Sequence, residues 1–579
     1  MDRYVVLIDA GGKQDFIFAS NKQAANIGAS DLIRILGEEW VPDAIAKVAA
    51  ELAPDAVTKR WEIVVASGKA VLEVPSGDIA RAIIRKVTKR ALDEAPGLLV
   101  CGVIVPVTDS LGVAVNAAHG EYRRHRPTLP PVELRTPTLP YVQPCQYSGL
   151  PATTTERETE RPQPDGSKLR KVPRARAIHE AWKRSRKARD HMASEVLHAE
   201  EEVLDREKLD QGVDDKGWIA IVHADGNGIG ALFDGLARLF ADDDEKYREV
   251  YGKLSRGLDE TAQKALRAAI DAKDEKKEPV SDWILPIVVA GDDVTVIMDG
   301  RVAFDVTCAF LKAFEELSGQ GKVHEALSEI RREHEKQRTN GDVPDRLTAA
   351  AGIAFVKRHH PFADAYELAE ELCGSAKLLK PLGQARGMLD FHVLHDSLAR
   401  HLSDLRSEEA GQIVTDGDGG QLRLWGGPYL LGHSGLGRPD GSESDRDLIW
   451  LREAAKELRP GEGFLSQDTR PAGDQKDSEQ TSAPEPALSI GALLRLRDAL
   501  AAGGDRIDRD RARIQDWADH PDQAEDYLDK HLRVNAPEIQ KTAGPVNTPF
   551  TRLVDALHLL DMRHGTTAED ETRREEQPA

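Results

Sequence analysis

Three aspartates have the type and spacing that metal-dependent chemistry needs. Asp292 and Asp293 are adjacent in PIVVAGDDVTVIM (286–298), between two runs of β-branched and apolar residues that are typical of buried strands. Each carboxylate disfavours ionisation of the other and burial disfavours both, so such a pair is costly without a compensating charge. Asp225 ends an earlier apolar run, GWIAIVHAD (217–225). If that strand lies beside the hairpin, a hard cation such as Mg²⁺ or Mn²⁺ would compensate for three converging carboxylates.

Glycines accompany these acids. Gly291 removes a side chain directly before the acid pair, where a ligand would need close approach to the backbone. Gly226, Asn227 and Gly228 precede a predicted helix, where free backbone amides and the helix dipole favour a phosphate. Carboxylates that hold magnesium beside a phosphate site are typical of phosphoryl transfer. The structural alternative, an acidic turn in an ordinary αβ sandwich, stays open at this point.

The elements that must position these residues follow a regular order between 217 and 395. Apolar runs predict four strands, at 217–225, 283–290, 294–298 and 347–356. Helical spacing predicts four helices, at 229–240, 247–270, 302–317 and 362–379. The order β-α-β-β-α-β is that of a ferredoxin-like unit with an antiparallel central hairpin.

The N-terminal part repeats this order. Its predicted strands are 3–10, 60–66, 69–74 and 97–107, and its predicted helices are 21–53 and 78–93. Superposition of the two units places Asp9 opposite Asp225 and Lys69 opposite Asp293. The first unit thus lacks the hairpin acids, which predicts an active second half and a structural, non-catalytic first half.

The composition limits the remaining classes. The formal net charge of −21 gives no support to general, charge-driven nucleic-acid binding. A basic helix around Lys183–Arg189 is the local exception, and a solvated helix face is its alternative interpretation. No apolar run approaches the length of a membrane span, and the four cysteines are widely scattered. We therefore expect a cytoplasmic protein without disulfides.

Three motifs together resemble the second palm domain of the CRISPR polymerase family, the large subunit of type III CRISPR effectors. They are ADGNGIG (224–230), AGDD (290–293) and ELCGSAK (371–377). The N-terminal GGKQDFIFASNKQAANIGASDLI (11–33) is similar to the first-palm signature of that family, and LWGGPY (424–429) to a short motif after the second palm. GGDEF cyclases are more distantly similar.

The resemblance implies roles for individual residues. Asp225 matches the first metal-binding aspartate, and Asp292 and Asp293 match the paired hairpin acids. Gly291 lies where the nucleotide approaches. Lys377 matches a lysine that faces the triphosphate, although a solvated helix lysine is an equally weighted alternative.

A further segment, PCQYSGLPA (144–152), resembles the zinc-binding insertion of the family. Ser148 stands where a second cysteine would complete a CxxC pair with Cys145, and no further cysteine lies nearby in the sequence. We therefore expect no structural zinc.

The predicted fold class is α+β, with two ferredoxin-like palm domains, a basic helical insertion and a mostly helical C-terminal region. The predicted boundaries are 1–124 for the degenerate first palm, 125–215 for the linker and basic insertion, 216–395 for the second palm and 396–579 for the C-terminal region. Within the last, 466–487 is predicted to be a disordered linker and 565–579 a disordered tail.

We therefore predict a magnesium-dependent nucleotidyltransferase or cyclase that converts ATP or another NTP into a cyclic or oligomeric nucleotide signal in antiviral defence. Two alternatives remain open. One is an RNA-binding scaffold of a type III CRISPR-like complex, which contacts RNA or other subunits through the helix around Lys183–Arg189. The other is a nucleotide-binding regulator without turnover, supported by Ala290 where the motif usually has glycine.

Overall fold

The computed structural model describes two long stretches of the chain. These are residues 3–197 and 217–431, apart from gaps at 21, 67, 136–138, 160–168, 272–283, 340–342, 359, 380–385, 396–400, 408–411 and 416–420, together with residues 448, 451 and 555. Most of the predicted C-terminal region 396–579, including 466–487 and 565–579, lies outside the described residues. None of the described helices is both long and apolar enough to cross a bilayer.

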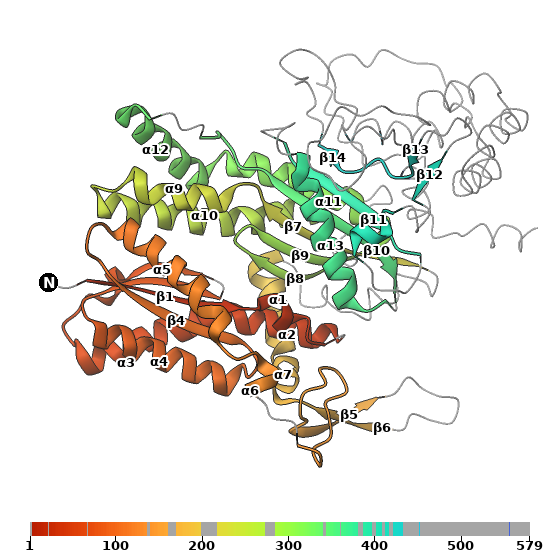
Figure 1. The fold of residues 1–579 in the computed structure, drawn as a ribbon, viewed down its shortest axis with the longest axis horizontal. Helices are drawn as coiled ribbons and strands as arrows, with labels where there is room; N and C mark the ends of the chain where they lie inside the picture. The colour runs from red at the N-terminus through yellow and green to blue at the C-terminus, as the bar shows by residue number, and fades with distance from the viewer. Residues whose placement is uncertain are drawn as a thin grey trace, which may run out of the picture.

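The first half is built on a four-stranded antiparallel sheet with the order β2-β3-β1-β4 (Figure 1). Its strands are β1 (Tyr4–Gly11), β2 (Glu62–Ala66), β3 (Lys69–Val74) and β4 (Leu99–Pro106). Its helices are α1 (Lys13–Ile17), α2 (Gln23–Ile35), η1 (Leu36–Trp40), α3 (Val41–Leu52), α4 (Gly77–Glu94) and α5 (Leu111–His125). Figure 1 shows α3 and α4 on one face of this sheet and α5 on the other, so β1 is covered on both sides.

The second half is built on a six-stranded sheet with the order β14-β11-β10-β7-β9-β8. Its strands are β7 (Trp218–Gly226), β8 (Ile284–Ala290), β9 (Asp293–Asp299), β10 (Ala349–Lys357), β11 (Met388–Val393) and β14 (Tyr429–Leu430). Its helices are α9 (Ile229–Leu239), α10 (Asp244–Ile270), α11 (Gly300–Ser318), α12 (Gly321–Gln337) and α13 (Phe362–Ala376). The four strands β8-β9-β7-β10 repeat the arrangement of the first sheet, and β11 extends it in parallel to β10.

A hairpin and a helix lie between the two halves in sequence. β5 (Thr154–Thr159) pairs with β6 (Leu169–Arg174), and α7 (Arg176–His191) follows and packs along α2. Gly28 allows this close approach, because a Cβ there would lie 1.7 Å from the Ala181 carbonyl oxygen. Shorter elements complete the described chain: η2 (Thr58–Trp61), η3 (Arg126–Thr128), α6 (Val132–Arg135), η4 (Met192–Leu197), η7 (Lys377–Leu379), α14 (Leu402–Leu405), β12 (Ile413–Thr415) and β13 (Gln421–Arg423).

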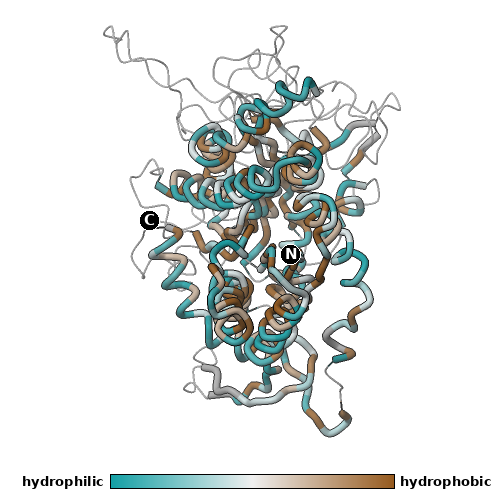
Figure 2. The backbone as a smooth tube through the Cα atoms, turned by 90° about the vertical axis from the view of Figure 1, so that its left-hand side faces the viewer, coloured by the Kyte–Doolittle hydropathy of each residue, from teal (hydrophilic) through white to brown (hydrophobic). Residues whose placement is uncertain are grey.

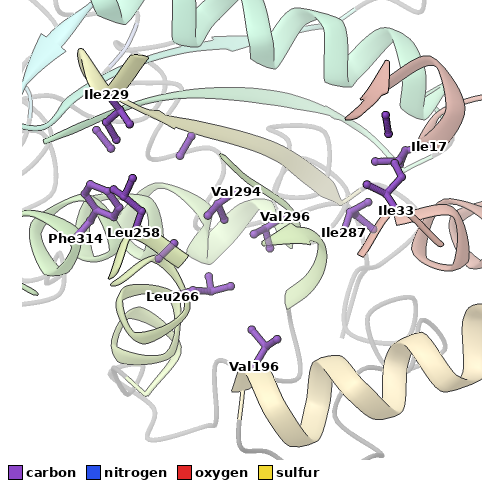
Figure 3. Packing of buried hydrophobic residues seen from close by; sticks show 14 of the residues in the cluster. Ile17, Ile33, Val196, Ile229, Leu258, Leu266, Ile287, Val294, Val296 and Phe314 are labelled. Atoms are coloured by element: carbon purple, nitrogen blue, oxygen red, sulfur yellow. The ribbon is translucent and has the colours of Figure 1, made fainter. Parts of the chain in front are cut away.

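The two halves share one hydrophobic core. Long helix α10 of the second half contacts β2 of the first, and α2 of the first half contacts β8 of the second. Figure 3 shows Ile17 and Ile33 of the first half beside Ile287 of β8. Hydrophobic segments gather inside both halves and hydrophilic ones on the outside (Figure 2). Each half therefore packs a helix against the central hairpin of the other, which fixes their relative position.

The structure confirms a mixed α/β fold and contains elements that the sequence analysis did not predict. Among the helices these include α5 and α12, and among the strands they are the β5–β6 hairpin, β11, β14 and the β12–β13 pair. α12 has the spacing of an amphipathic helix, with Val323, Ala326, Leu327 and Ile330 buried, so its sequence does carry the signal. The β5–β6 hairpin has mostly polar residues and lacks the apolar alternation that predicts a strand.

Candidate active site

Strand pairing brings Asp225 to the hairpin that carries Asp292 and Asp293. Ala224 pairs with Val294 at the end of the antiparallel β7–β9 ladder, so Asp225 and Asp293 are the next residues along the two strands. Ala290 pairs with Asp293 across the turn, which leaves Asp292 at the tip. The strand pairing therefore places all three acids at the same end of neighbouring strands β7 and β9 and the β8–β9 turn.

Gly226 lets the tip come close to the end of β7. A Cβ at this position would lie 2.9 Å from both Cβ and Oδ2 of Asp292, and 2.2 Å from Cδ1 of Ile229. Burial raises the pKa of Asp292, against the lowering effect of backbone N–H groups, including that of Gly226, and of the charge of Lys69. Gly226 is thus a close-packing position between the strand and the acid.

Asp293 has one oxygen buried without a partner. Its side chain is 43% exposed as a whole, yet Oδ1 is buried and accepts no hydrogen bond from the described residues. Nδ1 of His223 lies 3.5 Å from this oxygen. Burial, and then the charge of Asp292, raise the pKa of Asp293 to about 7. Burial, and then the charge of Lys377, lower the pKa of His223 to about 4, so this histidine is neutral at pH 7.

Lys377 forms an ion pair with Asp225 rather than extending into solvent. It lies in η7, directly after α13. In the described part of the chain, one group of three side chains has its potential ligand atoms all within 4.8 Å of one another, and it consists of Glu367, Glu371 and His401. The three aspartates therefore share an edge without forming a closed coordination shell.

The turn glycine is held by a residue that the sequence analysis did not identify. Gly291 has a positive φ of 65°, a conformation that favours glycine, and open space around its Cα. Its N–H donates to Oδ1 of Asp259 on α10 (3.0 Å). Burial raises the pKa of Asp259. No sequence signal marks Asp259, because it is one polar position among many on a long amphipathic helix.

The predicted phosphate-binding residues have different surroundings. Gly228 precedes α9 with a positive φ of 73°, and a Cβ there would meet nothing within 4 Å. Asn227 instead faces the start of β10, where Nδ2 donates to Oγ1 of Thr348 (3.0 Å) and the backbone N–H donates to the Thr348 carbonyl (2.8 Å). Gly228 thus keeps open backbone at the helix start, whereas the Asn227 side chain fixes the turn. Binding of a cofactor by either remains a prediction.

A cavity of about 410 Å³ lies between Asp292 and the first half. Gly291 and Asp292 line it from the second half, and Lys69, His119 and Arg123 are among its lining residues from the first. Asp9 pairs with Lys69 in the first ladder, which supports the predicted equivalence of Lys69 with Asp293. The first half therefore places a cation where the second half has an acid, and the cavity has charges of both signs.

The basic helix α7 is partly neutralised. Arg184 forms an ion pair with Asp31 of α2 and lies 3.4 Å from Glu39, so it is not available to a partner. Lys183, Arg186 and Lys187 are exposed. In the 144–152 segment, Cys145 is buried and free, and among the described residues no group of potential metal ligands includes it. Both the RNA contact and the absence of zinc remain predictions.

Asp225, Asp292 and Asp293 together form what we call the acidic edge of the second sheet. This edge and the fold around it define a palm-like α/β domain in the second half of the chain. Residues 218–381 match the family model described as Cas10/Cmr2, second palm domain. The resemblance to the CRISPR polymerase family is therefore confirmed, and the match lies on the half that carries all three acids. No curated protein matches this chain.

Several solved structures are similar to this chain at low identity. The crystal structures of the Csm1–Csm4 cassette in complex with cA4 and with AMPPNP are each 12% identical with a TM-score of 0.37, and the complex with cA3 is 12% identical with a TM-score of 0.38. Each comparison covers 67% of this chain and 54% of the solved chain. This chain thus spans about half the length of the structures it matches.

Proposed function

We propose that this chain is a magnesium-dependent nucleotidyltransferase or cyclase that uses ATP to make a cyclic or oligomeric nucleotide signal in CRISPR-type defence. The observation that carries the proposal is the convergence of Asp225, Asp292 and Asp293 at one sheet edge, within a segment that matches a Cas10/Cmr2 palm domain. We further infer that both sheets are ferredoxin-like palms, because each repeats the strand order 2-3-1-4.

The site residues fit a magnesium ion. All three donors are carboxylates, which Mg²⁺ prefers, and Oδ1 of Asp293 is buried without a hydrogen-bond partner among the described residues. Bound magnesium would lower the pKa of an attacking 3′-hydroxyl and neutralise charge that develops on the α-phosphate. The three aspartates would hold the ion, with sites left for phosphate oxygens.

The remaining residues would bind and orient the nucleotides. The open backbone at Gly228 and Gly291 leaves room for phosphates or a base close to the main chain. Lys377 would exchange its ion pair with Asp225 for a contact with the triphosphate. The cavity between the halves, with Lys69 and Arg123 in its lining, would take a second anionic reactant.

Product analysis tests this function. The purified chain is incubated with each NTP and Mg²⁺ or Mn²⁺, and products are identified by mass spectrometry. We expect a 3′-linked oligomeric or cyclic adenylate and pyrophosphate from wild type, and neither from Asp292→Ala. Failure to form any product with either metal, in a protein that binds ATP, would instead support a regulator without turnover.

A second candidate function is a nucleic-acid-binding scaffold. Trp182, 38% exposed, and the exposed Lys183, Arg186 and Lys187 share the outer face of α7, and the guanidinium of Arg174 lies 4.2 Å from the Trp182 ring centroid. An aromatic side chain among cations is a common surface for single-stranded nucleic acid. Fluorescence anisotropy with labelled RNA tests this candidate. Binding lost in a Lys183→Glu/Lys187→Glu variant would support it, and unchanged binding would contradict it.

A further inference from the structure

Helix α1 of the first half ends against α13 of the second half. Gln14 on α1 donates from Nε2 to the Tyr366 hydroxyl (2.7 Å) and to Oε1 of Glu370 (3.2 Å). At the end of α1, the Phe18 ring lies 4.1 Å from that of Tyr366 and 5.1 Å from that of Phe362, measured between centroids. A polar contact and an aromatic cluster therefore fix α1 on α13. Gln14 and Phe18 belong to the QDFIF stretch (14–18), to which the proposed function assigns no role.

Tyr366 contacts both α1 and His223, which lies beside the acids. It is 4% exposed, and its ring stands edge-on to that of His223 with the centroids 5.5 Å apart. Nδ1 of His223 lies in turn 3.5 Å from Oδ1 of Asp293. Burial, and then the charge of Asp293, raise the pKa of the Tyr366 phenol, which places the hydroxyl within the field of that acid. The side chains of Tyr366 and His223 thus connect Gln14 with Asp293.

Lys13, the residue beside Gln14, adds a positive charge that acts on the same acid. Nζ of Lys13 lies 3.4 Å from Oδ1 of Asp9, and the charge of Lys13 opposes the rise in the pKa of Asp293. Neighbouring residues of α1 therefore act on Asp293 by packing and by charge. The first half contributes to the environment of the acid although it lacks hairpin acids of its own.

We propose that Gln14 and Tyr366 are positioning residues for Asp293, through which the first half sets the orientation of an acid in the second. Oδ1 of Asp293 has no hydrogen-bond partner among the described residues, so its orientation depends on the packing of His223, which Tyr366 supports. Residues that orient a metal ligand without touching the metal commonly change metal affinity by tenfold or more. The inference rests on the proposed function, since it assumes that Asp293 binds the cation.

Metal affinity tests the inference without any turnover. Mn²⁺ binding to nucleotide-free protein is titrated by electron paramagnetic resonance for wild type, Gln14→Leu, Tyr366→Phe and the double variant. We expect each single variant to bind Mn²⁺ about tenfold more weakly. The double variant should bind about as weakly as Gln14→Leu alone, because both single changes remove the same hydrogen bond between Gln14 and Tyr366. Tyr366→Phe keeps the ring and hence the packing against Phe18.

The matched control is Arg248→Ala. Arg248 also links the halves, through an ion pair with Glu73 and a 3.0 Å hydrogen bond from Nη1 to the Arg60 carbonyl. Neither contact, in the part of the chain that the structure describes, involves one of the three acids. We expect it to leave Mn²⁺ affinity unchanged. Equal affinity in wild type and both single variants, or an equal loss in Arg248→Ala, would overturn the inference alone. A wild type that binds Mn²⁺ but forms no product would overturn the proposed function alone.

Discussion

At the scale of single residues, each aspartate of the acidic edge experiences the charge of a lysine. Asp225 is ion-paired with Lys377, the charge of Lys69 acts on Asp292, and that of Lys13 acts on Asp293. Two of the three lysines come from the first half. Ammonium groups partly offset the repulsion of the acids in the metal-free protein. A bound cation would take over this role and release the lysines towards phosphates.

The first residue-scale prediction concerns Asp9. Asp9→Ala should leave product formation largely intact, because Lys69 occupies the position equivalent to Asp293 and would repel a metal. Asp225→Ala, the equivalent change in the second half, should abolish product formation. Both variants are assayed by product mass spectrometry after their folding has been checked by circular dichroism. Loss of turnover in a well-folded Asp9 variant would contradict the assignment of a non-catalytic first half.

Burial of His119 should make the free energy of unfolding depend on pH. Burial, and then the charges of Lys69 and Arg123, lower its pKa from 6.5 to about 4. Between these values the unfolded chain binds the proton more readily, so stability is lost as the pH falls from 6.5 towards 4, at no more than about 1.4 kcal/mol per pH unit. His119→Asn should remove this part of the dependence. Denaturant unfolding of both proteins at pH 7, 6 and 5 would show parallel curves if this assignment is wrong.

At the scale of elements, the junction of β7 with the hairpin depends on one glycine. Gly226→Ala should destabilise the fold by about 1–3 kcal/mol through overpacking and displace Asp292, with loss of product formation. Gly230→Ala is the matched control, because a Cβ there meets nothing within 4 Å and alanine favours helix α9. Thermal unfolding of the Gly226→Ala and Gly230→Ala variants measures the difference in their stability. Equal stability of the two variants would contradict the close approach of Asp292 to β7.

Strands β8 and β9 of the acidic edge could be predicted from the sequence, because they are continuous apolar runs with a glycine-containing turn between them. β8 and β9 begin or end within one residue of the predicted bounds. Asp259 and Tyr366 could not be predicted, since each is one position on a helix and its neighbour in space is set by tertiary packing. The sequence analysis noted Lys69 only because it replaces an acid at the position equivalent to Asp293. The structure shows in addition that Lys69 lines the same cavity as Asp292.

At the scale of the whole molecule, two similar units pack reciprocally, and residues of both line an open, asymmetric cavity. Helix α2 lies on the second hairpin and α10 on the first. The repeat of the β-α-β-β-α-β order was readable from the sequence, whereas the way in which the halves face each other was not. That arrangement depends on contacts between residues that are hundreds of positions apart, such as Gln14 and Tyr366.

The central claim is that Asp225, Asp292 and Asp293 form a cation site. Removing one acid relieves repulsion in the metal-free protein and destroys metal affinity. Asp293→Ala should therefore form no product, yet melt at the same or a slightly higher temperature than wild type in metal-free buffer. Mg-ATP should raise the melting temperature of wild type by linkage of binding to folding, and that of the variant much less.

Melting temperatures of wild type and Asp293→Ala, each with and without Mg-ATP, test this claim most directly. A structural acid pair bonded to the turn backbone predicts the opposite pattern. The variant would then lose about 1–3 kcal/mol of stability and keep its response to the ligand. A stable variant that no longer responds to Mg-ATP is the result we predict, and a destabilised variant that still responds would contradict the cation site.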